Sequence, residues 1–176
     1  MGVIIRISGQ EKFAILAAEM RGPAQKAMRV ALNKQLRVAV APAVQEAKTA
    51  VRSLRIKSTR GGGRRQRMTK HGRHRGLRAS IATGIRVKVG YGGRPSIVIV
   101  VTPNLPADQQ KLPRDTNRPG GWRHPVFGNR HAWVQQFGTN WFEPAILKHR
   151  NTIVTELTKA LDDTARQIAS RVGGSR

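Results

Sequence analysis

The sequence predicts an α+β domain in which a small antiparallel sheet packs with a long, kinked N-terminal helix and a C-terminal helix. Residues 23–56 and 144–172 carry apolar side chains at helical spacing, and residues 85–102 contain two β-rich runs joined by GYGGRP. A chain of 176 residues with 39% hydrophobic residues suits a single domain spanning residues 1–176.

The N-terminal residues predict a strand followed by a short helix. Residues 3–7 read VIIRI, which is rich in β-branched side chains, and turn residues follow. Ser8 is a candidate N-cap with Glu11 three residues later, so we expect a helix over residues 9–20 that ends before Gly22.

Residues 23–56 give the strongest helical signal of the chain. Pro42 removes one helical hydrogen bond and crowds the preceding turn, which predicts a kink at residues 38–42. The stripe is rich in alanine, which favours close approach by another element, and we expect part of this helix to pack on a neighbouring subunit. The predicted stripe comprises Met28, Ala31, Leu32, Gln35, Ala39, Ala43, Ala47, Ala50, Val51 and Leu54.

Charge distinguishes the chain most clearly: 33 Lys and Arg face 9 Asp and Glu, a net charge of +24. Ten of the 24 residues at positions 55–78 are basic and none is acidic, and glycines are frequent there. Such a segment buries too little apolar surface to offset the entropy of ordering, so we predict a mobile basic arm or loop over residues 57–76. Contact with DNA or another polyanion is favoured over a merely solvated loop, and an acidic protein surface is an alternative partner. The predicted contact residues are Arg60, Arg64, Arg65, Arg67, Lys70, Arg73 and Arg75.

The middle of the chain predicts a β-hairpin. A turn of helix is expected over residues 77–82, before a half-exposed strand at 85–89 and a central, buried strand at 96–102. Residues 103–121 are rich in proline and polar side chains, which predicts an irregular loop.

Residues 120–145 hold all three tryptophans and three of the four phenylalanines. Glycines and prolines between the rings favour an ordered loop with a short strand at 132–137. Two interpretations stay open: the rings fill the core, or some of them form an assembly interface. The candidate interface residues are Trp122, His124, Phe127, Trp133, Trp141 and Phe142. The C-terminal helix that follows has one apolar face, formed by Ile146, Ile153, Leu157, Leu161, Ala165, Ile168 and Val172.

The sequence gives little sign of catalysis. There is no cysteine, the adjacent Asp162 and Asp163 would not face each other on a helix, and His71 and His74 have no acidic ligand nearby. We therefore predict no enzyme activity, no cofactor and no metal site. No apolar run is long enough to cross a membrane and the N-terminus lacks a secretory signal, so we expect a soluble protein that is not secreted by the general route.

From Trp122 onward the pattern W-R-H-P-V-F-G-N-R, then W-V-Q-Q, then W-F-E-P-A resembles the neck and tail-completion proteins of long-tailed double-stranded DNA phages. The alanine-rich helix at 23–56, the element Leu77-Arg78-Ala79-Ser80-Ile81 before a hairpin, and the C-terminal helix extend the resemblance over nearly the whole chain. Many relatives have Thr-Gly just before the Leu-Arg-x-Ser element, where this chain has Arg75-Gly76, and the long Arg-rich insertion is also unusual.

The resemblance implies a virion structural protein without catalysis, made in the host cytoplasm and assembled as a six-fold or twelve-fold ring at the head–tail junction. Its partners would be other copies of the chain, the neighbouring head-closure or adaptor and tail-tube or tail-terminator proteins, and packaged double-stranded DNA, with no membrane. The alternative is a sequence-nonspecific nucleic-acid-binding protein that acts through the Arg-rich arm. Residues 55–78 contain no aromatic residue, and this separation of basic and aromatic residues favours assembly over base stacking.

Overall fold

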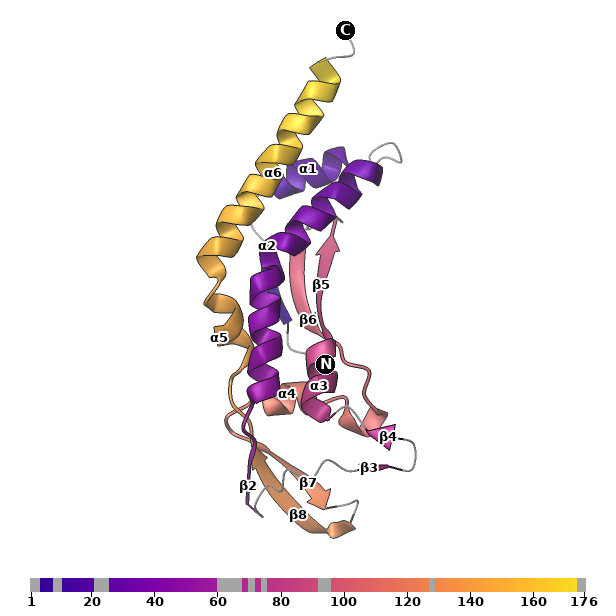
Figure 1. Cartoon of the computed structure of the whole chain (residues 1–176), viewed down its shortest axis with the longest axis vertical. Coiled ribbons are helices and arrows are strands. Elements are labelled where there is room, and N and C mark those ends of the chain that lie inside the picture. Colours follow the sequence, from indigo (N-terminus) through magenta and orange to yellow (C-terminus); the bar gives the residue numbers. More distant parts are fainter. Residues whose placement is uncertain are drawn as a thin grey trace.

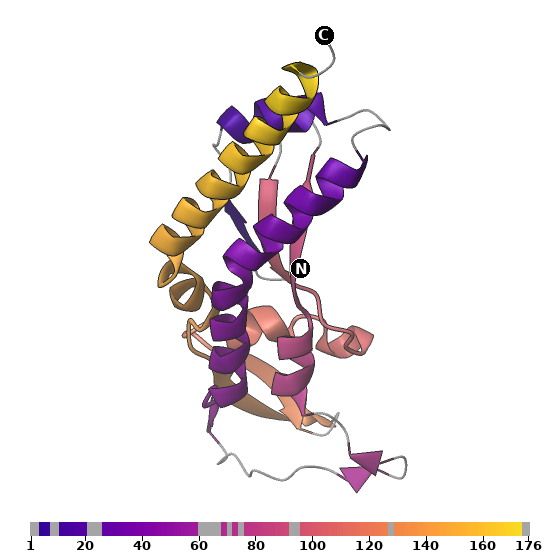
Figure 2. The same ribbon diagram turned by 45° about the horizontal axis from the view of Figure 1, so that its top comes forward.

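Two three-stranded antiparallel sheets lie at different levels of an elongated molecule, with helices running alongside the upper one (Figures 1 and 2). The computed structural model describes residues 4–7, 11–20, 26–59, 68–69, 72–73, 76–91, 96–126 and 129–173. The predicted α+β class, with a long N-terminal helix and a C-terminal helix packed on an antiparallel sheet, is confirmed.

The upper sheet has the order β1-β6-β5, with β1 at Ile4–Ile7, β5 at Ile85–Gly90 and β6 at Ser96–Val101. The predicted hairpin and the central position of its second strand are confirmed. Along β5, Arg86 and Lys88 are exposed while the residues between them are partly buried, as expected for a strand with one face in water.

Helix α2 (Lys26–Ser53) packs against β5, the short helix α3 (Leu77–Thr83) and the two C-terminal helices. Pro42 lies inside α2, and the helix bends partway along its length (Figures 1 and 2). The buried face differs from the predicted stripe, because Leu36 and Val40 are fully buried while Ala31 and Gln35 are exposed.

The C-terminal helix predicted from residue 144 is two helices, α5 (Phe142–Leu147) and α6 (Arg150–Gly173). One prediction for its apolar face was wrong: Ala165 is exposed, and the buried position is Thr164, whose hydroxyl donates a hydrogen bond to the Ala160 carbonyl at 2.8 Å. The main-chain acceptor satisfies the buried hydroxyl group.

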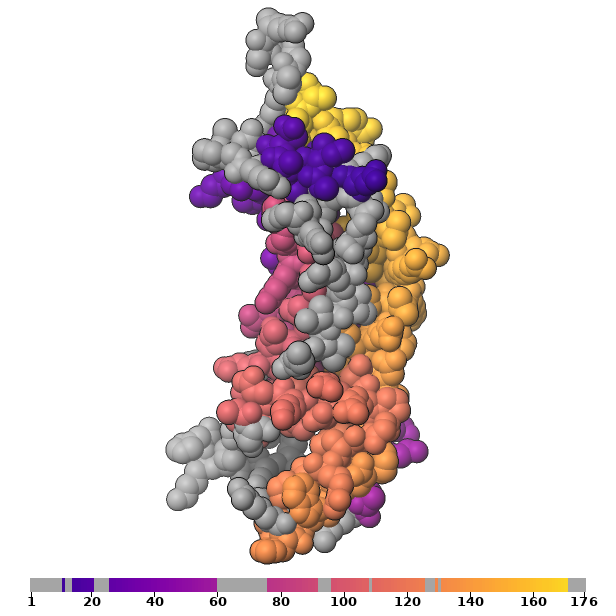
Figure 3. All heavy atoms as spheres, turned by 180° about the vertical axis from the view of Figure 1, so that it is seen from behind, coloured from indigo at the N-terminus to yellow at the C-terminus, as the bar shows by residue number. Residues whose placement is uncertain are grey.

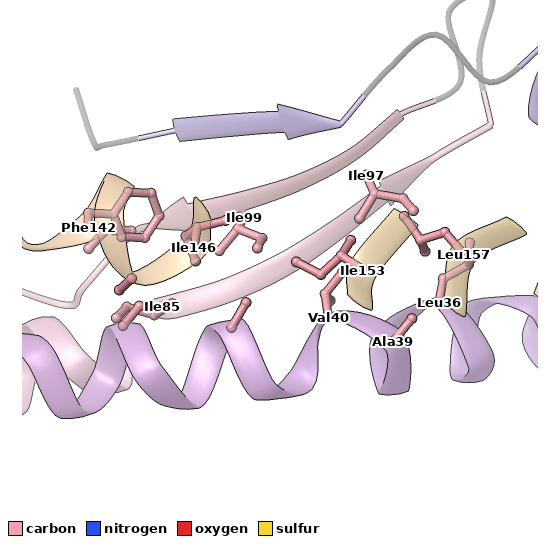
Figure 4. Close-up of a cluster of buried hydrophobic side chains, with 14 of the residues drawn as sticks. Leu36, Ala39, Val40, Ile85, Ile97, Ile99, Phe142, Ile146, Ile153 and Leu157 are labelled. Atoms are coloured by element: carbon pink, nitrogen blue, oxygen red, sulfur yellow. The ribbon is translucent and has the colours of Figure 1, made fainter. Parts of the chain in front are cut away.

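The hydrophobic core forms where α2, the upper sheet and the C-terminal helices meet, and Figure 4 shows their side chains converging. The labelled members are Leu36, Ala39, Val40, Ile85, Ile97, Ile99, Phe142, Ile146, Ile153 and Leu157. Helix α1 (Glu11–Glu19) packs beside α6 at the far end (Figure 1). It lies within the predicted range 9–20, whereas the proposed cap Ser8 falls outside the described residues.

The prediction of an irregular loop at 103–121 was wrong in part, because this segment contains a 3-10 helix, Ala107–Gln109, and helix α4, Leu112–Thr116. Pro106 directly precedes the 3-10 helix as its N-cap residue, and Pro113 lies in the first turn of α4, where its missing N–H removes no helical hydrogen bond. Asn117 follows α4, and its side-chain oxygen accepts hydrogen bonds from the backbone N–H groups of Trp141 and Phe142, both at 2.9 Å.

The lower sheet has the order β2-β8-β7, with β2 at Lys57–Ser58, β7 at Trp122–Val126 and β8 at Asn129–Phe137. The short strand predicted at 132–137 is confirmed as part of β8, whereas β2 and β7 were not predicted. Lys57 and Ser58 pair with β8, so the expectation that the mobile arm begins at residue 57 was wrong for these two residues. A two-stranded ladder joins β3 (Met68–Thr69) to β4 (Gly72–Arg73).

Gly84 ends α3 at a very close approach to the chain after β6. A Cβ atom at this position would lie 2.4 Å from both Cα and N of Pro103. We expect Gly84→Ala to lower the free energy of unfolding by about 1–3 kcal/mol or more, because backbone atoms must move to relieve the overlap. Urea unfolding measures the loss. Gly76→Ala is the matched control, since no atom lies within 4 Å of its Cβ position, and equal losses for the two variants would contradict the described packing.

Tyr91 follows β5 and donates a hydrogen bond to Asn33 Oδ1 of α2 at 3.0 Å. Burial raises the pKa of Tyr91 to about 12, while the positive charge of Arg29 acts in the opposite direction. Because this pKa is higher in the folded than in the unfolded protein, the contribution of Tyr91 to stability is complete below about pH 10 and is lost as the pH rises towards 12. Urea unfolding of the wild type and Tyr91→Phe across this range is expected to show their stability difference shrinking. A difference independent of pH would contradict this assignment.

Candidate functional site

One face of the lower sheet exposes aromatic and basic side chains together. In antiparallel pairs, directly opposed residues lie on the same face, and alternate residues of a strand share that face. Lys57 is opposite Phe137, Arg123 is opposite Gln135, and Pro125 is opposite Trp133. We call the set Lys57, Arg123, Trp133, Gln135 and Phe137 the aromatic face.

The rings of the aromatic face are accessible to a ligand. Trp133 is 45% exposed and Phe137 is 38% exposed, and both basic side chains are exposed. The guanidinium carbon of Arg123 lies 5.7 Å from the centre of the Trp133 ring, within the range of a cation–π interaction. The strands β2, β7 and β8 contain no acidic residue, and Lys57 and Arg123 make the charge of this face positive.

Backbone contacts near Gln135 hold the residues after β2 and the residue before β7 close to β8. Beyond β2, the Thr59 N–H donates a hydrogen bond to the Gln135 carbonyl at 3.1 Å, which holds the start of the basic segment against β8. Gly121 has a φ of 74°, and a Cβ atom there would lie 2.3 Å from the Gln136 carbonyl oxygen and 2.9 Å from the Phe137 ring. Only glycine allows this backbone conformation and approach without strain.

The opposite face of the lower sheet is more enclosed. It carries Trp122 opposite Gln136 and His124 opposite Val134; Val134 is buried and the other three are half-buried. The Trp122 indole N–H is buried without a hydrogen-bond partner among the described atoms. Seen from behind, β7 and β8 form the lower end of the molecular surface (Figure 3).

The six candidate interface residues therefore divide into groups. Trp141 (5% exposed) and Phe142 (0% exposed) are core residues whose rings meet edge to face at 5.4 Å, so the prediction of a surface contact was wrong for these two. Trp133 is exposed, Trp122 and His124 are half-buried on the opposite face, and Phe127 lies outside the described residues.

The predicted polyanion contacts fall almost wholly outside the described residues. This applies to Arg60, Arg64, Arg65, Arg67, Lys70 and Arg75. Arg73 is described only by its backbone, in β4.

Four residues of the aromatic face are not among the predicted site residues: Lys57, Arg123, Gln135 and Phe137. A signal was present: Trp133, Gln135 and Phe137 are spaced by two residues, which puts them on one face of a strand. The partners on β2 and β7 could not be found in this way, because pairing register is not visible in local sequence.

A second surface feature lies between α2 and α6. It is an open groove of about 450 Å³, lined by Ala31, Lys34, Gln35, Val38, Ala39, Glu156, Lys159, Ala160 and Asp163. Val38, which lines it, is 65% exposed. The groove therefore presents an exposed apolar side chain of α2 to the solvent.

Neither feature resembles a metal centre: no group of three or more His, Asp or Glu that could hold a metal ion occurs in the part of the chain that the structure describes. Among the same residues, no helix is long and apolar enough to cross a membrane. No protein-family model, curated protein or solved structure matches the chain.

Substitutions test the assignment of Trp141 to the core and of Trp133 to the surface. We expect Trp141→Ala to lower the free energy of unfolding by about 3–5 kcal/mol, because it empties a buried site. Trp133→Ala is the matched control and is expected to cost about 1 kcal/mol or less, because nearly half of that side chain already contacts water. Thermal or urea unfolding measures both, and a larger loss for Trp133→Ala would contradict the assignment.

Proposed function

We propose that this chain is a structural protein of the neck of a long-tailed DNA phage, which assembles as a ring at the head–tail junction and has no catalytic activity. The order of elements supports the proposal most strongly. The alanine-rich helix α2, the Leu77–Ile81 element in α3, the β5–β6 hairpin, the aromatic strands β7 and β8, and the C-terminal helices follow one another as the resemblance implies.

The groove between α2 and α6 supports the ring arrangement. A ring needs heterologous contacts, in which one face of a subunit meets a different face of the next. The groove places exposed Val38 among charges that balance, because Glu156 and Asp163 of α6 lie there together with Lys34 and Lys159. Because copies with a net charge of +24 repel one another, a contact through this charge-balanced groove adds less repulsion than a contact through a basic surface would.

The positive charge supports a contact with DNA in the lumen of the ring. Lys and Arg side chains attract phosphates without reading the base sequence. Such binding weakens steeply as the salt concentration rises, because the release of counterions from the DNA then becomes less favourable. The packaged duplex is the polyanion that a neck protein would meet, and the neighbouring adaptor and tail proteins complete the set of partners in this proposal.

The aromatic face favours a second candidate, a free nucleic-acid-binding protein. The separation of basic and aromatic residues seen in the sequence is lost in the fold, because Lys57 pairs with Phe137 and Arg123 stacks on Trp133. Aromatic rings interleaved with cations on one sheet face are typical of proteins that stack on bases.

The solution mass of the purified protein, at low and high salt, distinguishes the two candidates. We expect a discrete ring, and we expect Val38→Glu to shift it towards monomer because the substitution buries a charge at the subunit contact. Leu147→Glu, at another exposed apolar position, is the matched control and is expected to keep the ring. A wild type that stays monomeric at every concentration while binding DNA tightly would favour the second candidate instead.

A further inference from the structure

We propose that the aromatic face binds the unpaired bases of a single-stranded nucleic acid, with Trp133 and Phe137 as stacking platforms and Lys57 and Arg123 as phosphate contacts. This inference goes beyond the neck function and does not depend on it. It also places recognition on residues other than those of the basic segment 60–75.

The aromatic face places rings that can stack on a base next to cations that can pair with a phosphate. Both rings are exposed, and a base stacked on either of them would lie within reach of a cation on the neighbouring strand. The Arg123 guanidinium lies over the Trp133 ring, so a base that stacks on this ring face would take its place and leave the cation to pair with a phosphate, while Lys57 is opposite Phe137. An acidic peptide would pair with the cations but leave the rings in water. A nucleotide uses both, because its base is flat and apolar and its phosphate is anionic.

The spacing of the rings suits successive contacts along a strand. Trp133 and Phe137 are four residues apart on β8, which corresponds to about 13 Å. Gln135 lies between them on the same face, and its side-chain amide can donate to and accept from the edges of a base. The rings are therefore far enough apart to stack separate bases rather than compete for one.

Duplex DNA cannot use the rings in this way. Its bases are stacked on one another and present only their edges in the grooves, so a duplex would meet this face through phosphates alone. Unpaired strands expose the flat surfaces of their bases. The exposed rings consequently distinguish single strands from duplex, whereas the net charge of +24 attracts both.

Fluorescence anisotropy with the full-length protein tests the proposal. The probes are a labelled oligothymidylate, an abasic oligonucleotide of the same length, and a duplex of that length. We expect Trp133→Ala and Phe137→Ala each to weaken binding of the oligothymidylate about tenfold, and by a similar factor at low and high salt, because stacking involves no counterion release. Binding of the abasic strand and the duplex is expected to stay unchanged.

Variants of the cationic residues distinguish base stacking from electrostatic attraction to phosphates. The double variant Lys57→Gln with Arg123→Gln is expected to reduce the salt dependence for all three probes. Lys26→Gln with Arg37→Gln removes the same charge from exposed positions on α2 that do not line the groove, and is expected to have a smaller effect on the oligothymidylate. Trp133→Phe keeps an aromatic ring and is expected to restore most of the affinity lost in Trp133→Ala.

The proposal is overturned if the two ring variants, shown by thermal unfolding to be folded, bind the oligothymidylate as tightly as the wild type. Equal losses for the abasic strand, the duplex and the oligothymidylate would overturn it as well, because they would show that the rings do not contact bases. Neither result bears on ring assembly, so the neck function is tested separately by the solution mass.

Discussion

The fold depends on how closely other elements can approach the buried side of α2. Ala39, Ala43 and Ala47 are buried along this side, and their small side chains let α5, α6 and the upper sheet pack near the helix backbone. Larger residues of the same helix, Leu36 and Val40, are fully buried in this core as well (Figure 4). A chain with few aromatic residues thereby builds a continuous core in spite of the repulsion among its many positive charges.

Polar links join the lower sheet to this core. The Asn117 side chain holds the start of α5, and Gly138 lies so close to the Thr116 carbonyl that a Cβ atom would come within 2.2 Å of its oxygen. Thr139 N–H also donates to that carbonyl, at 3.1 Å. Because the hydrophobic core cluster contains no described side chain of β7 or β8, one face of the lower sheet can expose rings and cations, as binding surfaces commonly do.

Local sequence predicted those elements whose pattern is carried by neighbouring residues. The hairpin of β5 and β6 and the helix α2 belong to this group. Of the lower sheet, only the strand at 132–137 does. The short strand β2 pairs with a distant part of the chain, with Lys57 opposite Phe137, and β7 contains Pro125, which disfavours a strand assignment. For the same reason local sequence indicates Trp133 as an interface residue, whereas Lys57 falls in the predicted arm and Arg123, which lies over the Trp133 ring, is not among the predicted site residues. The break between α5 and α6 carries no glycine or internal proline to mark it.

The order of genes around the coding sequence tests the central claim most directly. A neck protein is expected to be encoded between genes for a portal and a tail tube, because phage structural genes that assemble together are grouped together. Such neighbours are the result that the proposed function requires. Neighbours with roles in host chromosome organisation or RNA metabolism would contradict the neck function and leave nucleic-acid binding through the aromatic face as the better account.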